Sequence, residues 1–200
     1  MNRVIDQTAP PLPTGVRPPE RLALPGGVSL RRRTADDIVP FNAAVVRNLE
    51  HLRPWMPWAV SAPTLERTGE MTEVGRLAWE DGTDFLYLAG LDAAPGSVLG
   101  AFGLHGRIGP GALEIGYWVD LAFTGRGIAT DAAAALTAAA LELPGIHRTE
   151  IHCDQANAAS ATVPRKLGYR LDRVRQDPIS APAETGRKLI WVKEIPVEEP

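Results

Sequence analysis

Residues 114–131 read Glu-Ile-Gly-Tyr-Trp-Val-Asp-Leu-Ala-Phe-Thr-Gly-Arg-Gly-Ile-Ala-Thr-Asp, and this order predicts a strand, a glycine-containing turn and the start of an alanine-rich helix. The first N–H groups of a helix have no acceptor within the helix, and the helix dipole adds partial positive charge at the same end. Such a turn is suited to a phosphate or pyrophosphate. We expect the amides from Gly125 to Thr130 to form this cradle.

The glycine pair of this turn, within residues 124–129, is a short motif. It lacks the third glycine and the ribose-binding acid of a dinucleotide-binding fold, and it lacks the Gly-Lys-Ser/Thr of a Walker A loop. On spacing alone, a plain strand-to-helix turn explains it as well as a phosphate site does.

Length and composition indicate one ordinary globular domain. The chain has 200 residues and a formal net charge of −3, which argues weakly against a nucleic-acid partner and is compatible with a cationic substrate. Only three of the 21 basic residues are lysine, and with the many alanines this is typical of proteins from GC-rich bacterial genomes.

The cysteine and histidine content and the hydropathy of the chain argue against disulfides, metal sites, membrane spans and secretion. The single Cys153 excludes an intramolecular disulfide and a cysteine-based metal cluster, and the four histidines do not have metal-ligand spacing, so we expect no metal. No apolar run approaches the roughly 20 residues that span a bilayer, and the N-terminus has no secretory apolar core. We therefore expect a cytoplasmic protein without a membrane partner.

The chain divides into a proline-rich N-terminal extension (1–26), one domain (27–195) and a short tail (196–200). Periodicity and turn residues predict helices over 35–52, 65–80, 127–143 and 157–167. They predict strands over 28–33, 85–91, 98–108, 113–120, 148–153, 169–175 and 187–195. The three central strands with short turns indicate an antiparallel meander. The fold class is therefore α/β (α+β), one mixed sheet with helices on its faces.

A second polar motif opens the helix predicted from residue 157. Asn157 is an N-cap, and Ser160 lies one turn further on, so both side chains can face the same groove. Pro164 removes the N–H that would bond the carbonyl of Ser160. That carbonyl is expected to lie beside a polar or wet cleft. The simpler alternative is that Asn157 only caps the helix.

Taken in this order, the two motifs resemble the acetyl-CoA-binding segments of the GNAT superfamily of N-acetyltransferases. The family signature is Gln/Arg-x-x-Gly-x-Gly/Ala; Gly127 and Ala129 match it, whereas Thr124 departs from its first position. Residues 52–58 (Leu-Arg-Pro-Trp-Met-Pro-Trp), 114–119 and 157–169 are similar to the RimJ/RimL branch, which acetylates ribosomal-protein N-termini. The resemblance covers about residues 28–195.

The resemblance implies a GNAT fold, with a mixed, largely antiparallel sheet of six to seven strands, helices on both faces and a splayed pair of central strands. It implies acetyl-CoA as co-substrate and a primary amine as acceptor, either a protein N-terminus or a small molecule. A non-catalytic acyl-CoA-binding module and a transferase for a longer acyl group are the alternatives. A homodimer is left open.

The resemblance also implies roles for individual residues. Ser160 is the candidate acid for the leaving thiolate, and Glu114 is the candidate proton acceptor, unless it only pairs with an arginine. Trp55 and Trp58 are candidates for the acceptor pocket, with core filling as the alternative. The residues expected to bind the cofactor are Tyr117, Trp118, Val119, Thr124, Gly125, Arg126, Gly127, Ile128, Ala129, Thr130, Asn157 and Ser160.

Overall fold

The computed structural model describes residues 12–195 and forms one sheet of eight strands in the order β1-β2-β3-β4-β5-β6-β8-β7. The strands are β1 (Arg21–Leu24), β2 (Val28–Arg32), β3 (Asp84–Leu91), β4 (Gly100–His105), β5 (Ala112–Val119), β6 (Arg148–Asp154), β7 (Arg170–Gln176) and β8 (Arg187–Glu194). The helices are η1 (Ala35–Asp37), α1 (Ile38–Arg47), α2 (Leu49–Leu52), α3 (Leu65–Asp81), η2 (Leu121–Phe123), α4 (Ile128–Leu141) and α5 (Ala158–Lys166).

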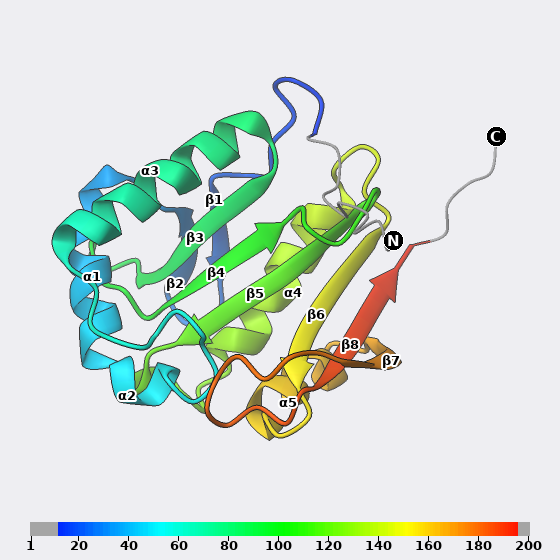
Figure 1. Ribbon diagram of the computed structural model, residues 1–200. Helices are drawn as coiled ribbons and strands as arrows, with labels where there is room; N and C mark the ends of the chain where they lie inside the picture. Colours follow the sequence, from blue (N-terminus) through cyan, green and yellow to red (C-terminus); the bar gives the residue numbers. More distant parts are fainter. Residues whose placement is uncertain (1–11, 196–200) are drawn as a thin grey trace, which may run out of the picture.

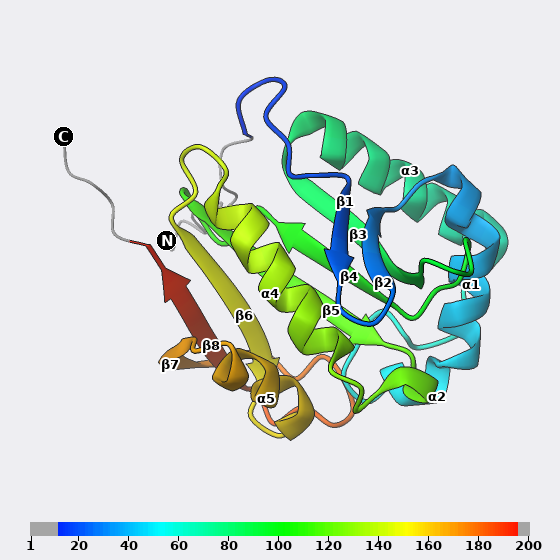
Figure 2. The same cartoon turned by 180° about the vertical axis from the view of Figure 1, so that it is seen from behind.

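Helices cover both faces of the sheet. We call the face with α1, α2 and α3 the front face (Figure 1) and the face with α4 and α5 the rear face (Figure 2). The alanines of α4 bring it close to the sheet, where Ala132, Ala133 and Leu136 are completely buried. The predicted α/β class and the mixed, largely antiparallel sheet are confirmed. No helix within residues 12–195 is long and apolar enough to cross a membrane.

The sheet has one strand more than expected, because residues 21–24 pair with β2 as an antiparallel edge strand. These residues belong to the segment that we expected to lie outside the domain. Residues 1–11 and the expected tail, 196–200, lie outside the described residues, so the domain boundaries themselves stay a prediction.

The single helix expected over residues 35–52 is interrupted at Asn48. The Asn48 side chain donates to the carbonyl of Ala44 (2.8 Å) and accepts from the backbone N–H of Leu121 (2.8 Å). Such side-chain bonds compete with the helical ladder. Asn48 therefore ends α1 and ties it to the segment that follows β5.

The central strands β5 and β6 form the only parallel pair of the described sheet, and they stay paired over a short distance. The register joins Ala112–Glu114 to Arg148–Glu150 and goes no further. Beyond that point β5 remains paired with β4 as far as Val119, and β6 remains paired with β8 as far as Asp154. This separation, which we call the fork, confirms the expected splayed pair of central strands.

Candidate active site

The turn between β5 and α4 presents a row of free backbone amides. Gly125 (φ 73°) and Gly127 (φ 85°) adopt left-handed backbone conformations that favour glycine. Gly127 is the N-cap of α4 and has no side chain to cap the helix. No backbone oxygen of residues 12–195 accepts from the amides of 125–130, and the first capping bond runs from the Asp131 N–H to the Gly127 carbonyl (3.0 Å). The turn can thus bind an anion through its backbone.

The side chains of the turn are only partly available to such an anion. The Arg126 guanidinium lies 5.0 Å from the centre of the Phe123 ring, and both groups are near the surface. The Thr124 hydroxyl donates to the Leu121 carbonyl (2.9 Å). Thr124, the residue that departs from the family signature, therefore contributes to the shape of the turn.

Beyond the fork, the edge of β5 that faces β6 has no strand partner among the described residues. Tyr117 and Val119 pack against the rear core, whereas Trp118 packs in the front core, with its ring 6.2 Å from that of Phe41. Because the side chains of 117–119 pack into the two cores, the backbone of these residues is the part of the strand that can bind an extended ligand arm by strand addition.

Helix α5 faces this open edge from the other side of the fork. The Asn157 side-chain oxygen accepts from the Ser160 N–H (3.0 Å), as expected of an N-cap. The Tyr117 hydroxyl lies 3.2 Å from the Ser160 carbonyl oxygen and 3.3 Å from its Oγ. The carbonyl that Pro164 leaves without a helical donor is thus bonded across the gap. Burial raises the pKa of Tyr117, so its hydroxyl stays protonated and can donate.

Glu114 is the last residue of β5 that pairs with β6, and its side chain is almost completely buried. Arg107 donates to both of its carboxylate oxygens, at 2.8 Å each. Burial raises the pKa of Glu114, but the hydrogen bonds from Arg107 and the charges of His152 and Arg107 outweigh burial and leave that pKa lowered. The structure therefore contains the arginine pairing that the sequence left as an alternative to a role as base.

Glu114 belongs to a row of titratable side chains across the front face. The strand register places His105 of β4 opposite Asp84 of β3 on one side and opposite Glu114 of β5 on the other. Glu150 of β6 continues the row on the far side of Glu114. Its carboxylate lies 2.5 Å from Nε2 of His152 and 3.0 Å from the Arg148 guanidinium. Each buried carboxylate at the fork thus has cationic partners, which offsets the repulsion between the two.

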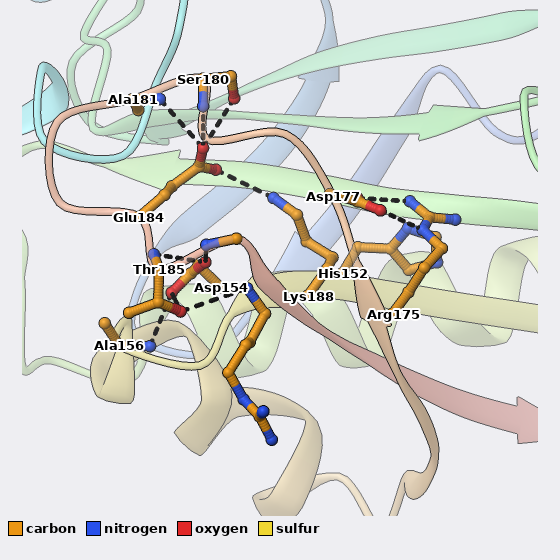
Figure 3. A network of polar contacts seen from close by, with 12 residues as sticks. His152, Asp154, Ala156, Arg175, Asp177, Ser180, Ala181, Glu184, Thr185 and Lys188 are labelled. Atoms are coloured by element: carbon orange, nitrogen blue, oxygen red, sulfur yellow. Dashed lines mark hydrogen bonds and ion pairs between the residues drawn. The ribbon is translucent and has the colours of Figure 1, made fainter.

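A polar network ties the loop over residues 177–186, which connects β7 to β8, to the end of β6 (Figure 3). The carboxylate of Asp154 accepts from the N–H groups of Ala156, Thr185 and Gly186 and from the Thr185 hydroxyl, at 2.9–3.1 Å. Glu184 accepts from Ser180, Ala181 and Lys188 at 2.7–3.0 Å. Asp154 therefore holds the C-terminal end of the loop, and Glu184 links the middle of the loop to the start of β8.

The loop also contacts the aromatic turn after α2. The Ala183 N–H donates to the carbonyl of Pro54 (3.0 Å), next to Trp55. Trp55 is half-buried and Trp58 is 51% exposed, so Trp58 does not fill the core. A role of these two rings in the acceptor pocket stays a prediction.

Sequence reasoning did not single out Asp84, Arg107, His105 or Glu150. The available signal was the spacing Gly103-x-His105 in a strand, which places an imidazole beside an empty position on the same face. Within residues 12–195 no group of three or more His, Cys, Asp or Glu side chains is arranged to hold a metal ion.

Comparison with known proteins agrees with this geometry. A family model described as an acetyltransferase (GNAT) domain matches residues 28–170. RimL, a ribosomal L7/L12 alpha-N-protein acetyltransferase solved with coenzyme A, superposes with a TM-score of 0.80 at 22% identity, over 88% of this chain and 98% of that chain. RimJ of Mycobacterium smegmatis, in complex with CoA-disulfide, gives 0.78 at 22% identity, over 92% and 90%.

The microcin C7 self-immunity acetyltransferase MccE, solved with acetyl-CoA and AMP, gives a TM-score of 0.79 at 18% identity, over 88% of this chain and 97% of that chain. No curated protein matches the chain. At these identities, the solved structures show that the chain shares their fold.

Proposed function

Because the chain belongs to the GNAT acetyltransferase family, we propose that it transfers an acetyl group from acetyl-CoA to a primary amine by direct attack in a ternary complex. The observation that carries this proposal is the fork. Beyond Glu114, β5 separates from β6, and the turn that follows β5 presents free backbone amides. When bound, acetyl-CoA would supply an activated acyl group, and the protein would supply binding, orientation and proton transfer.

The residues at the fork fit such a carrier. The amides of 125–130 are suited to its pyrophosphate, and the free edge of 117–119 to its amide-containing arm. The side-chain oxygen of Asn157 accepts the capping hydrogen bond, so its amide N–H groups are free to donate to the arm. An N–H near Tyr117–Val119 would polarise the acetyl carbonyl, as in an oxyanion hole.

Two side chains are assigned to proton transfer and charge. Ser160 lies within reach of the Tyr117 hydroxyl and is proposed to protonate the leaving thiolate. Glu114 is proposed to provide a fixed negative charge that attracts the ammonium form of the acceptor. With its pKa lowered it is a weak base, so removal of the amine proton calls for another group.

The acceptor is proposed to enter from the front face, beside the joined loop 177–186 and aromatic turn near Trp55 and Trp58. The related ribosomal-protein acetyltransferases favour a protein N-terminus as the acceptor, and a small-molecule amine is the alternative acceptor class. The remaining proposals are that the protein works in the cytoplasm without nucleic acid or membrane, and that it can form a homodimer.

An acceptor screen tests the function. Purified protein is incubated with acetyl-CoA and a panel of peptides and small amines, CoA release is measured, and mass spectrometry locates the added acetyl group. We expect release that depends on a primary amine. Parallel reactions with longer acyl-CoAs test the alternative donor.

A non-catalytic acyl-CoA-binding module is the second candidate. It is favoured by the fact that Glu114 and Ser160 are both already engaged, by Arg107 and Tyr117. This candidate predicts CoA binding in calorimetry without acetyl transfer to any amine. Transfer that is lost in Ser160→Ala, with CoA binding retained, would exclude it.

A further inference from the structure

The imidazole of His105 occupies a defined position on the front face of the sheet. Its Nδ1 lies 2.9 Å from Oδ1 of Asp84, directly across the β3–β4 pair. An ionised carboxylate only accepts hydrogen bonds, so the ring proton belongs on Nδ1 and Nε2 carries the free lone pair. Among residues 12–195 no hydrogen-bond partner is bound to that Nε2.

Two glycines make room for this ring. Gly103 and Gly116 face each other in the β4–β5 pair, and a Cβ atom on them would lie 2.7 Å and 3.1 Å from Nε2 of His105. Nothing larger than glycine fits at Gly103 without moving the imidazole. Gly116 already lies in the part of β5 that has left β6, next to Tyr117. Nε2 therefore lies over the strand at the beginning of the open edge.

The ring is also accessible. The His105 side chain is 19% exposed, and no helix crosses the front of β4 and β5 at this end of the strands in Figure 1. Besides Asp84, the charged groups of the neighbouring strand and turn are Glu114, directly opposite His105, and Arg107, which pairs with Glu114. The ring of His105 thus lies between the carboxylates of Asp84 and Glu114.

The other titratable side chains at the fork are less suited to take a proton. Glu114 is held by two hydrogen bonds from Arg107. His152 is bonded through Nε2 to Glu150, and its Nδ1 lies 3.7 Å from Glu114, so both of its nitrogens face carboxylates. His105 alone combines an orienting carboxylate on one nitrogen with an accessible lone pair on the other. This is the arrangement of a general base.

We propose that His105, oriented by Asp84, is the base that deprotonates the acceptor amine. This inference rests on the proposed acetyl transfer. The Nε2 lone pair takes one proton from the ammonium form, which leaves a neutral amine and an imidazolium paired with Asp84. The amine nitrogen then bonds to the acetyl carbon as the carbon–sulfur bond breaks, and its second proton passes to the thiolate through Ser160. The imidazolium returns its proton to water.

His105→Asn tests the assignment, because the asparagine amide can still donate to Asp84 but offers no basic nitrogen. We expect kcat/KM to fall about 10²-fold near neutral pH. Alpha-amines titrate near about pH 8, so at higher pH the acceptor is already neutral and the loss should shrink. A merely structural role would lower the rate by the same factor at every pH.

Two further measurements make the result independent of that variant. Added imidazole should restore part of the activity of His105→Ala, because the truncated side chain leaves a space over Gly103 and Gly116. In the protein without substrate, NMR of the histidine rings should show the proton of His105 on Nδ1, and Asp84→Asn should remove this preference. His147→Asn, just before β6 at the end where β5 and β6 are still paired, is the matched control for both the rate and the pH profile.

A pH-independent loss in His105→Asn, or full activity in that variant, would overturn the inference while acetyl transfer by the wild type still stands. Calorimetry with CoA separates these outcomes from a binding defect, because His105→Asn should bind CoA as the wild type does. Absence of acetyl transfer by the wild type itself would count against the proposed function instead, and the NMR result would still report whether Asp84 sets the tautomer.

Discussion

The Tyr117 hydroxyl lies 3.2 Å from the carbonyl oxygen of Ser160 and thereby joins β5 to α5 across the fork. Pro164, four residues after Ser160, has no N–H to bond that carbonyl within the helix. A proline inside α5 and a tyrosine on β5 are thus parts of one interaction. Helix α5, which lacks one of its own backbone hydrogen bonds, therefore forms one side of the gap in which a ligand arm would lie.

Tyr117→Phe should lower the free energy of unfolding by about 1 kcal/mol, since it leaves a half-buried carbonyl without its donor. In a Pro164→Ala background this cost should fall toward zero, because the new N–H of residue 164 can donate to the same carbonyl. Urea denaturation of the two single variants and the double variant measures the coupling. The prediction fails if the two effects simply add.

Tyr169→Phe is the matched control for this cycle. The Tyr169 hydroxyl is also buried, but it bonds the hydroxyls of Thr137 (2.6 Å) and Thr149 (2.8 Å). Removing the Tyr169 hydroxyl should lower the free energy of unfolding by a similar amount in the wild-type and the Pro164→Ala backgrounds.

The glycines of the cradle should matter for CoA binding beyond their effect on stability. Gly125 (φ 73°) and Gly145 (φ 80°) both have left-handed conformations, and a Cβ atom would meet nothing within 4 Å at either. Alanine at each position should therefore cost a similar 1–2 kcal/mol or so of stability. Only Gly125→Ala should also weaken CoA binding in calorimetry, because it reshapes the amides at the N-terminus of α4. Equal CoA affinity in the two variants would remove the cradle from the binding site.

Much of the fork could be predicted because its signals are local. Gly127 and Asn157 stand immediately before helices and mark their beginnings, and Pro144-Gly145 marks the end of α4. The orphaned carbonyl of Ser160 follows from proline four residues later, whatever the rest of the chain does. These features need no knowledge of tertiary contacts.

The acceptor side could not be predicted in this way. The row formed by Asp84, His105, Glu114 and Glu150 depends on the register of three strand pairs, and a slip of one residue in any of them would turn the side chains to the other face. The break at Asn48 likewise depends on an acceptor–donor contact with Leu121, which is 73 residues away along the chain. Sequence periodicity contains neither kind of information.

The loop 177–186 should loosen in acid through Glu184. Burial raises the pKa of this carboxyl, but the N–H groups of Ser180 and Ala181, the Ser180 hydroxyl and Lys188 outweigh it and lower the pKa to about 2. The folded-state pKa therefore lies below that of the unfolded chain, about 4.3. The stabilisation that the Glu184 carboxylate contributes is complete above the unfolded-state pKa and is lost as the pH falls toward the folded-state pKa.

Glu184→Gln should consequently be less stable than the wild type at neutral pH, and the difference in free energy of unfolding should shrink as the pH falls from about 4.3 toward about 2. Urea denaturation at several pH values measures this difference. Glu142→Gln, at an exposed position at the end of α4, is the control and should show a small effect at every pH. A difference for Glu184→Gln that stays constant down to the lowest pH would contradict the assignment.

Removing Arg107 alone should destabilise the fold more than removing the charges of both Arg107 and Glu114. Glu114 is buried, whereas the side chain of Arg107 is 57% exposed, so the coupling should be smaller than the 3–5 kcal/mol or so typical of a fully buried pair. We expect Arg107→Met to cost about 1–3 kcal/mol, because it leaves a carboxylate without its partner beside Glu150. Adding Glu114→Gln should recover most of that cost.

The exposed Arg76–Glu73 pair on α3, with a 2.6 Å contact, is the control for this cycle. Its coupling in urea denaturation should be much smaller than that of the Arg107–Glu114 pair, because solvent screens it. Arg107→Met also lets the pKa of Glu114 rise, since the group that keeps it low is gone. In the wild type, Glu114 contributes stability that is lost as the pH falls from its unfolded-state pKa toward its lower folded-state pKa. In Arg107→Met this acid-dependent loss should therefore shrink or disappear. If both pairs coupled equally, or if the acid profile did not move, Glu114 would not depend on Arg107 for its charge, and it would return as the stronger rival to His105 for the amine proton.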